Sequence, residues 1–351
     1  MIVAGAGAIG GYLGARLALA GHAVTLVGRQ PLADAVAAQG LTLIEPDRRS
    51  VVTDCRVVTS MVEAFSRSET FDLALITVKT YDTHAIIEQL RPYAQAVGCL
   101  LSLQNGVSSE TLLGAAFGCE KVVAGTILNP VSVREPGVVV LEKRRGGIGL
   151  AFPPAGASAG PLVRHFGRAG FTVRPCADAY SMKWSKLILN LIGNASSAIL
   201  DLNTMEIFAD KRTFSLEIEA LREALRVASA DGVRFVGLPG YPVPLLVAAI
   251  RLLPLPLLQP ILGPFVARGR GAKMPSLHVD LHGGKSRSEI DELNGAVVRL
   301  GERLGIRTPA NALLVKTFTD LQARRAKVLE WKYRADRLWA AYVERAETVR
   351  A

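Results

Sequence analysis

Residues 5–10 read Gly-Ala-Gly-Ala-Ile-Gly, a GxGxxG pattern close to the start of the chain. The pattern follows a short β-branched run and precedes a helical pattern of leucines, as in a strand–turn–helix unit. Glycines there permit a tight turn and let backbone N–H groups approach a pyrophosphate at the helix N-terminus, where the helix dipole favours negative charge. The motif therefore predicts a dinucleotide site, with a purely structural glycine-rich turn as the alternative. The predicted contacts are Gly5, Ala6, Gly7, Ala8, Ile9 and Gly10.

The residue after the second predicted strand bears on which dinucleotide is bound. NAD sites carry an acid about 20 residues beyond the glycine motif, where it accepts hydrogen bonds from the ribose 2′-hydroxyl. Here the strand ends in Val27-Gly28-Arg29-Gln30, with no acid nearby. A guanidinium matches a 2′-phosphate in bidentate fashion, so Arg29 favours NADP(H) over NAD(H). The alternative is that Arg29 is an ordinary solvated charge.

A lysine and two asparagines follow one another at helical spacing in the second half of the chain. Lys186, Asn190 and Asn194 stand at i, i+4 and i+8, and on one helix they would span an arc of about 80°. The residues between them are apolar or glycine, so these polar groups need partners, supplied either by the protein or by a substrate. We favour a substrate, and we expect Lys183, one turn earlier, to be solvated.

A carboxylate and two histidines come later in the chain. Glu289 begins a predicted helix that Ser288 is placed to cap, and the residues alone do not favour catalysis over service to the helix dipole. His278 and His282 have the i, i+4 spacing of metal ligands, but no third ligand is evident in the sequence. We therefore expect surface or polar-network histidines and predict no metal site.

Two kinds of element must position these residues. Short β-branched runs alternate with helical patterns over the first half, which predicts a mostly parallel sheet with crossover helices. Two antiparallel pairs are also expected, one from runs 41–44 and 51–58 and one from runs 137–141 and 147–152, with a loop at 153–158. The runs predicted as parallel strands are Ile2–Ala4, Ala23–Val27, Leu73–Val78, Leu100–Leu103 and Val122–Thr126.

From about Ala179 the β-runs give way to helical periodicity, so we predict an α/β dinucleotide-binding domain at 1–177 and an all-α domain at 178–351. An apolar run from Tyr241 to Val266 contains six prolines and one charge, Arg251. A membrane span needs about 20 uninterrupted apolar residues, so we expect the prolines to break this run into pieces of two or three turns. The run would then lie in the core, at a dimer interface or over an active site. Apolar residues from Val328 to Val349 predict an amphipathic helix docked on its own chain.

Composition narrows the function classes. The 351 residues are 50% hydrophobic and 21% charged, which fits a packed globular protein of two domains. The net charge of +10 is spread along the chain among acids, with few aromatic residues, so nucleic-acid binding is not expected. The cysteines, Cys55, Cys99, Cys119 and Cys176, lack metal-site spacing, and no leader precedes the first predicted strand. These features predict reduced thiols and a cytoplasmic protein.

Taken in order, the motifs resemble those of the ketopantoate reductase (2-dehydropantoate 2-reductase) family, over nearly the whole chain. The matching segments are Gly5-Ala-Gly-Ala-Ile-Gly10, Thr77-Val-Lys79, Leu103-Gln-Asn105-Gly106, Lys183-Trp-Ser-Lys186-Leu with Asn190 and Asn194, Pro275-Ser276-Leu277 and Glu289-Ile-Asp291-Glu-Leu-Asn-Gly295.

The resemblance implies a Rossmann-type domain, a helical domain and an active site in the cleft between them. It implies that Lys186 is the proton donor and that Glu289 lies beside it and the cofactor. Substrate contacts would come from Asn105, Asn190, Asn194 and Ser276, and NADPH would be held by the glycine motif, Arg29, Lys79, Asn105 and Glu289. A further substrate asparagine of the family falls near Asn203-Thr204, where the match slips by one residue, so it is not assigned.

The function implied is NADPH-dependent reduction of a small 2-keto acid, foremost 2-dehydropantoate to pantoate in the biosynthesis of pantothenate and coenzyme A. The run at 241–270 is longer than in compact members, which keeps a different 2-keto acid open. A non-catalytic NADP(H)-binding regulator is the alternative from another class. Such a regulator would need the glycine motif but no proton donor, so the line of Lys186 and the asparagines favours catalysis.

Overall fold

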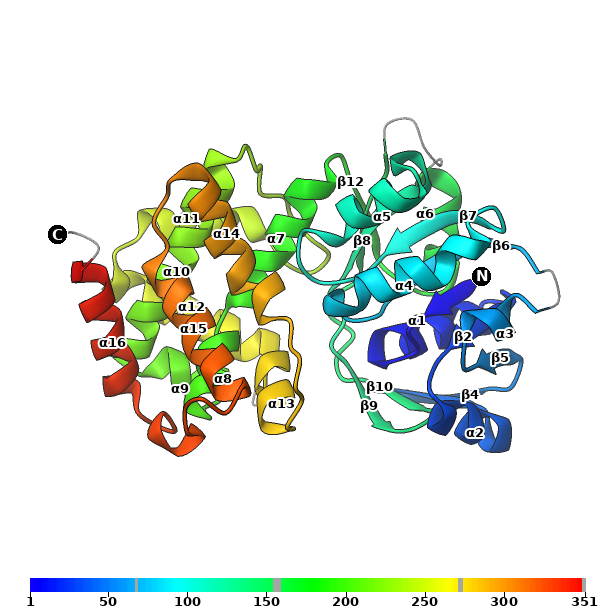
Figure 1. The fold of residues 1–351 in the computed structure, drawn as a ribbon, viewed down its shortest axis with the longest axis horizontal. Coiled ribbons are helices and arrows are strands. Elements are labelled where there is room, and N and C mark those ends of the chain that lie inside the picture. The colour runs from blue at the N-terminus through cyan, green and yellow to red at the C-terminus, as the bar shows by residue number, and fades with distance from the viewer. Residues whose placement is uncertain (67–68, 154–158, 271–273, 349–351) are drawn as a thin grey trace. The chain divides into compact units, whose positions relative to one another are not determined.

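The computed structural model describes the chain except for residues 67–68, 154–158, 271–273 and 349–351 (Figure 1). Its backbone contacts divide into two compact units, one of Met1–Lys183 with Gly237–Tyr241 and one of Trp184–Val236 with Pro242–Ala351. The first unit is α/β and the second is helical, which confirms the predicted fold class. The division falls within helix α7 (Ala179–Leu191), whereas the sequence placed a domain limit just before this helix.

The main sheet of the α/β unit has eight strands in the order β12-β11-β8-β7-β6-β1-β2-β5. The six neighbouring strands β8, β7, β6, β1, β2 and β5 run parallel. Strand β11 is antiparallel to β8. This arrangement places β1 at the centre, as in dinucleotide-binding folds. The strands are β1 (Ile2–Ala4), β2 (Val24–Val27), β5 (Cys55–Val58), β6 (Phe71–Ile76), β7 (Val97–Ser102), β8 (Val122–Ile127), β11 (Ile148–Ala151) and β12 (Val173–Cys176).

A second sheet of four strands has the order β4-β3-β10-β9. It contains β3 (Leu41–Glu45), β4 (Arg48–Val52), β9 (Val131–Glu135) and β10 (Val138–Leu141). The hairpin of β3 and β4 confirms half of one prediction, but run 51–58 is not a single strand. Its second half is β5, which leaves the hairpin after Thr53 and Asp54 and joins the parallel sheet beside β2.

The predicted pairing of runs 137–141 and 147–152 is wrong. Strand β10 pairs with β9 and β3, while β11 pairs with β8 and β12 in the main sheet. The turn at Gly137 makes β9 the local partner of β10, and β9 was not predicted from the sequence. The loop predicted at 153–158 lies outside the described residues apart from its first residue.

Helices cover both faces of the main sheet because side chains alternate along each strand. In β1, Val3 packs into one apolar cluster, and Ile2 and Ala4 pack into another. The first cluster contains side chains of α1 and α6, and the second contains side chains of α3, α4 and α5. The helices of this unit are α1 (Ala8–Leu19), α2 (Gln30–Gln39), α3 (Met61–Ala64), α4 (Thr83–Leu90), α5 (Ser109–Phe117) and α6 (Ala159–Arg168).

The helical unit is built around α10 (Lys211–Ala230), which contacts α9, α11, α12, α14, α15 and α16. Asp210 caps this helix by accepting from the backbone N–H groups of Arg212 and Thr213. The other helices after α7 are α8 (Asn194–Leu200), α9 (Thr204–Ala209), α11 (Val243–Leu252), α12 (Leu255–Arg270), α13 (Ser276–His282), α14 (Asn294–Leu304), α15 (Pro309–Gln322) and α16 (Ala335–Thr348).

The proline-rich run forms α11 and α12. The run is divided as expected, but Pro260 and Pro264 lie inside α12, so this helix of 16 residues is longer than the expected two or three turns. Leu258, Leu262 and Val266, one turn apart, are buried, while Leu257 and Ile261 are exposed. The run therefore packs on its own unit, where α12 contacts α9. Within the described residues, no helix has the length and apolarity that crossing a membrane requires.

The C-terminal helix packs on α10 and α15, as predicted, but it begins later than expected. A short 3-10 turn at Val328–Glu330 precedes it, and Tyr333 has a positive φ of 59°. This backbone angle is unfavourable for a bulky residue and ends the helical path, so α16 starts at Ala335.

Candidate functional site

The glycine motif forms the turn between β1 and α1. Gly5 has a φ of +100°, and a Cβ there would lie 2.7 Å from the backbone nitrogen of Val78. A Cβ on Gly10 would collide with the carbonyl oxygen of Gly5, whereas a Cβ on Gly7 would meet nothing within 4 Å. Gly5 and Gly10 are therefore required by the turn and its packing, while the space beside Gly7 stays open.

The N-terminus of α1 begins at this open space. Gly7 is its N-cap, no side chain caps it, and the first turn contains no acid. The first backbone N–H groups of a helix lack partners within the helix and form the positive end of its dipole. This arrangement fits the pyrophosphate of a dinucleotide.

Arg29 lies at the end of the neighbouring strand, where β2 runs parallel to β1. The backbone nitrogens of Gly5 and Ala6 donate to the carbonyl oxygen of Val27 at 3.2 and 2.9 Å, which joins the glycine loop to this strand end. Arg29 is exposed at the start of α2, and its guanidinium has no ion pair with any described residue. Its place fits recognition of a 2′-phosphate at the adenosine end of the cofactor.

Lys79 and Asn105 follow β6 and β7, and both are partly exposed. Because β1, β6 and β7 are parallel neighbours, these residues lie at the same edge of the sheet as the glycine loop. The two loops are tied together, since the hydroxyl of Thr80 donates to the carbonyl oxygen of Asn105 at 2.9 Å. Gln104 donates through Nε2 to the carbonyl oxygen of Val78 at 3.1 Å.

Lys183 is not solvated, which corrects the sequence prediction. Its side chain is only 3% exposed, and Nζ donates to the carbonyl oxygen of Gln104 at 2.8 Å. The same ammonium lies 2.7 Å from Oε1 of Glu110 on α5, an ion pair outside ordinary hydrogen-bond geometry. Lys183 therefore supports the loop that carries Asn105. Sequence reasoning missed this role because the partners lie 79 and 73 positions away in the chain.

Lys186 and Asn190 stand out by their exposure. Every side chain from Ser181 to Leu200 is buried except these two, which are partly exposed on α7. Both make polar interactions with other groups of the protein, so neither is an isolated charge or amide. A cation and an amide one turn apart in an otherwise buried stretch of this helix are suited to a polar ligand.

Asn194 does not continue the face of α7, which corrects the prediction of one helix. The helix ends at Leu191, and Gly193 has a φ of +60°. Glu217, buried on α10, accepts the N–H of Gly193 at 2.7 Å and the hydroxyl of Ser196. This acceptor holds the break from which α8 begins at Asn194, and no local pattern in the sequence indicates it.

Asn194 is buried and joins three segments. Its Nδ2 donates to the carbonyl oxygen of Asn190 at 3.1 Å and lies 3.5 Å from Oγ of Ser276. Its Oδ1 accepts the N–H of Leu277 at 3.1 Å, which caps the start of α13. The structure thus brings Asn190, Asn194 and Ser276 together, and Ser276 itself is exposed.

Glu289 is 2% exposed and precedes a 3-10 turn at Ile290–Glu292. The predicted helix is present, but its predicted start at Glu289 is wrong. Leu293 has an irregular backbone, and α14 begins only at Asn294. The hydroxyl of Ser288 accepts the N–H of Ile290 at 3.4 Å, a weak form of the predicted cap.

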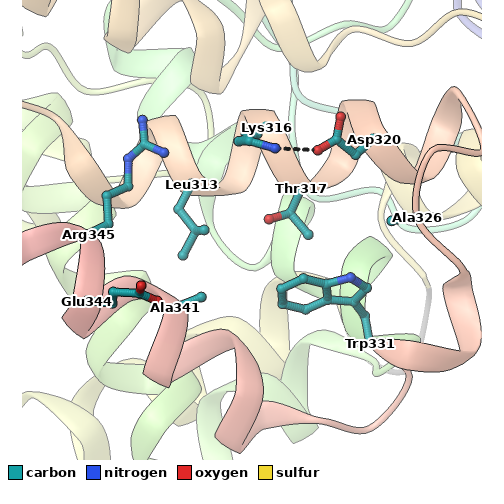
Figure 2. A pocket seen from close by; sticks show the side chains of 9 residues that line it. All are labelled: Leu313, Lys316, Thr317, Asp320, Ala326, Trp331, Ala341, Glu344 and Arg345. Carbon is teal, nitrogen blue, oxygen red and sulfur yellow. Dashed lines mark hydrogen bonds and ion pairs between the residues drawn. The ribbon is translucent and has the colours of Figure 1, made fainter.

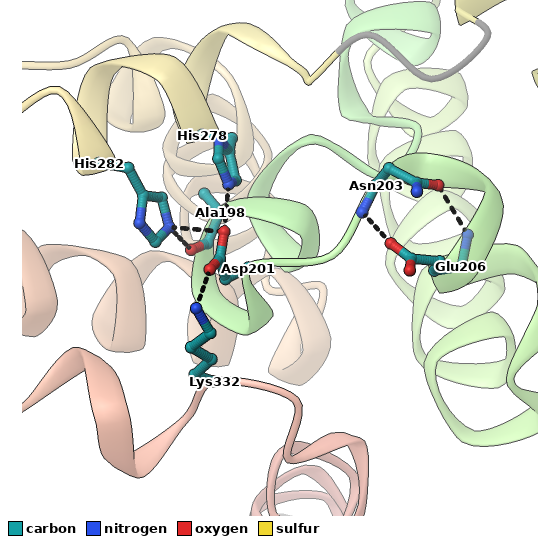
Figure 3. Close-up of polar contacts among 7 residues, drawn as sticks. All are labelled: Ala198, Asp201, Asn203, Glu206, His278, His282 and Lys332. Atoms are coloured by element: carbon teal, nitrogen blue, oxygen red, sulfur yellow. Dashed lines mark hydrogen bonds and ion pairs between the residues drawn. The ribbon is translucent and has the colours of Figure 1, made fainter.

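Two other regions of the helical unit contain none of the predicted site residues. Asn203 is the N-cap of α9, where its Oδ1 accepts the N–H groups of Met205 and Glu206 and Glu206 accepts its N–H in return (Figure 3). A pocket of about 530 Å³ lies beside α15 and α16. Its lining includes Trp331 and the ion pair of Lys316 with Asp320 (Figure 2).

Comparison with known proteins places these features in one family. Residues 1–151 match the model described as ketopantoate reductase PanE/ApbA, and residues 178–322 match the model of its C-terminal domain. The 2-dehydropantoate 2-reductase of Pyrococcus horikoshii is 28% identical over 315 residues, covering 89% of this chain and 94% of that protein.

Solved structures agree in fold. A PanE/ApbA family ketopantoate reductase from Ralstonia eutropha is 30% identical, with a TM-score of 0.77 and coverage of 93% of this chain and 99% of that one. D-mandelate dehydrogenase, solved with NADH and anilino(oxo)acetate, has a TM-score of 0.77 at 21% identity, covering 92% of this chain and 98% of that one.

The fold and the glycine loop define a nicotinamide-dinucleotide-dependent oxidoreductase. The chain belongs to the ketopantoate reductase family.

Proposed function

We propose that this protein reduces a small 2-keto acid to the 2-hydroxy acid with NADPH, and that its substrate is 2-dehydropantoate, which becomes pantoate. The observation that carries the proposal is the pair of partly exposed polar residues, Lys186 and Asn190, in the otherwise buried stretch 181–200. A regulator that only binds a nucleotide has no need of such a pair.

The α/β unit is proposed to hold the cofactor. The uncapped N-terminus of α1 suits the pyrophosphate, and Arg29 suits the 2′-phosphate. Lys79 and Asn105 lie at the same sheet edge and are proposed further contacts. When bound, NADPH supplies the hydride for the carbonyl carbon, and the alkoxide so formed takes one proton.

Lys186 is proposed to give that proton and to stabilise the developing alkoxide by its charge. Donation by an ammonium to an alkoxide leaves a neutral amine and the 2-hydroxy acid, and the amine is then reprotonated from solvent. Glu289 is proposed to lie near the reacting groups and to favour the charged form of the lysine if its carboxylate is ionised.

Asn190 and Ser276 are proposed to orient the carboxylate and the hydroxyl groups of the substrate. Asn194 has its amide engaged by protein groups, so its proposed part is to hold Asn190 and Ser276 in place. Asn190 and Ser276 are then neutral hydrogen-bond donors held on rigid helices, and such donors can orient a small acid.

A different 2-keto acid is the second candidate. D-mandelate dehydrogenase, whose printed ligands are NADH and anilino(oxo)acetate, has the same fold. This likeness favours including aryl and branched 2-keto acids among the substrates tested.

The test is a panel of 2-keto acids, each assayed with NADPH and with NADH, with the product identified by mass spectrometry. We expect the highest kcat/KM for 2-dehydropantoate with NADPH and one hydroxy acid formed per NADPH oxidised. Preference for an aryl 2-keto acid would keep the reaction and change the substrate. Tight NADPH binding without turnover of any acid would instead indicate the regulator.

A further inference from the structure

Two histidines and an aspartate of the helical unit lie close together, and none of them is a proposed site residue. His278 and His282 lie one turn apart on α13, with ring centroids 4.1 Å apart and planes within 23°. Nε2 of His278 lies 2.7 Å from Oδ1 of Asp201, and Nε2 of His282 lies 3.9 Å from the same oxygen (Figure 3). The three possible ligand atoms all lie within 4.8 Å of one another.

These separations are close to what one metal ion requires. In a tetrahedral zinc site with ligands at about 2.0–2.1 Å, two ligand atoms are about 3.3 Å apart. His278 must therefore move away from Asp201 by about 0.6 Å and His282 must approach by about the same amount. Small rotations of the two histidine side chains are enough, since Asp201 and His278 are partly exposed and His282 is exposed.

We propose that Asp201, His278 and His282 bind one transition-metal ion of the zinc type. The sequence lacked a third ligand for the histidine pair, because Asp201 lies 77 positions before His278. The fold supplies it at the end of α8, and the fourth position is left to water.

The surroundings of the aspartate fit a ligand that uses one oxygen. Lys332 lies 2.7 Å from Oδ2, so Oδ1 is the oxygen that faces the histidines. Metal-binding carboxylates commonly accept a second hydrogen bond of this kind, which fixes their orientation.

The site must compete with one existing bond of His282. Its Nε2 lies 2.9 Å from the carbonyl oxygen of Ala198, where a neutral ring donates its proton. Binding through Nε2 moves that proton to Nδ1, so this bond is lost, and the hydrogen bond between His278 and Asp201 is lost as well. Two imidazoles and one carboxylate select zinc-like ions over Mg²⁺ or Ca²⁺, which prefer oxygen ligands.

The location of the site means that a bound ion would link two helices. Asp201 follows α8 and the histidines lie on α13, and these are the helices that begin at Asn194 and Ser276. An ion at this place would join the ends of the two helices and stabilise the native unit by an amount that grows with the logarithm of the ion concentration above the dissociation constant.

The experiment is a Zn²⁺ titration of the full chain against a chromophoric chelator, in a Cys119→Ser background because that thiol is exposed. We expect one Zn²⁺ per chain, with affinity lowered on the order of tenfold or more in His278→Gln, His282→Gln and Asp201→Asn. Asparagine tolerates the positive φ of 54° at position 201, so this variant should fold. His22→Gln is the matched control because His22 also packs against a second histidine, His165.

The melting temperature is the second measurement. Zn²⁺ should raise it in the parent and in His22→Gln but not in the three ligand variants, and Mg²⁺ should raise it in none. Circular dichroism establishes that each variant is folded. Equal Zn²⁺ affinity in the parent and the folded ligand variants, or no Zn²⁺ binding by the parent at micromolar concentration, would overturn the proposal.

Discussion

Two lysines one turn apart on α7 have different environments. Lys183 is buried against Gln104 and Glu110, while Lys186 is partly exposed, as is Asn190 one turn later. Lys183 therefore supports the Asn105 loop, while proton donation by Lys186 stays a proposal. The resemblance to the family implied the role of Lys186, and the spacing favoured only a substrate contact. The sequence misjudged Lys183 because burial depends on distant residues.

Replacement of Lys186 tests the proton donor. A transition-state acid contributes about 10²–10⁴ in rate, so Lys186→Ala should lower kcat by that order while NADPH binding changes little. Steady-state kinetics and fluorescence titration of NADPH measure the two effects.

The matched control is Lys183→Met, which leaves Glu110 without its ion pair. This variant should lower the melting temperature and keep most of kcat at low temperature. A Lys186→Ala variant with normal kcat and reduced thermal stability would make Lys186 structural.

Arg29 carries the prediction about the cofactor. A hydrogen bond to a charged group contributes about 1.5–3 kcal/mol, so Arg29→Ala should weaken NADPH binding by that amount. NADH lacks the 2′-phosphate, and its affinity should hardly change. Isothermal titration of both nucleotides measures the difference, and equal losses would remove Arg29 from phosphate recognition.

Glu223 carries a prediction about pH. Burial raises its pKa from 4.5 to about 6, although it accepts hydrogen bonds from the backbone of Ala310 and Asn311. The native state then holds more protons than the unfolded state between these values. Its contribution to stability is present below pH 4.5 and is lost as the pH rises through about 6, a change of roughly 2 kcal/mol.

Urea unfolding at pH 4.5 and pH 7 measures this change. Because other groups also titrate, the quantity compared is the free energy of unfolding of the parent minus that of Glu223→Gln. If this difference in free energy does not decrease from the lower pH to the higher one, the pKa of Glu223 is not raised.

At the scale of elements, strands with local signals were predicted well. The parallel strands β1, β2, β6, β7 and β8 follow from β-branched runs between helices. Pairing was harder, since β5 and β11 join the main sheet instead of their sequence neighbours. The break at Gly193 also escaped prediction, because the acceptor that holds it, Glu217, belongs to another helix.

Helix α12 provides a matched pair of leucines for a stability test. Leu258 is 0% exposed and Leu257 is 56% exposed. Leu258→Ala should destabilise the protein by about 2–5 kcal/mol, because it leaves a cavity where α12 packs on its own unit. Leu257→Ala should change stability by less than about 0.5 kcal/mol. Denaturant unfolding compares the two, and equal effects would contradict the described packing.

At the scale of the whole molecule, the sequence predicted an α/β unit followed by a helical unit, and the structure and the family agree. The predicted site residues divide between them. The glycine motif, Arg29, Lys79 and Asn105 belong to the first unit, and the others belong to the second. Their roles were assigned through resemblance, because an isolated Lys, Asn or Glu has several physical explanations. The NADPH preference, the homodimer and the cytoplasmic location stay predictions.

The reaction itself is the claim on which the account depends. The most direct measurement follows deuterium from NADPH labelled at nicotinamide C4 into the product of 2-dehydropantoate, read by mass spectrometry. The account predicts one deuterium at C2 of pantoate from one face of the labelled cofactor, at a rate that Lys186→Ala lowers. NADPH that binds but transfers no deuterium to this or any other 2-keto acid would contradict it.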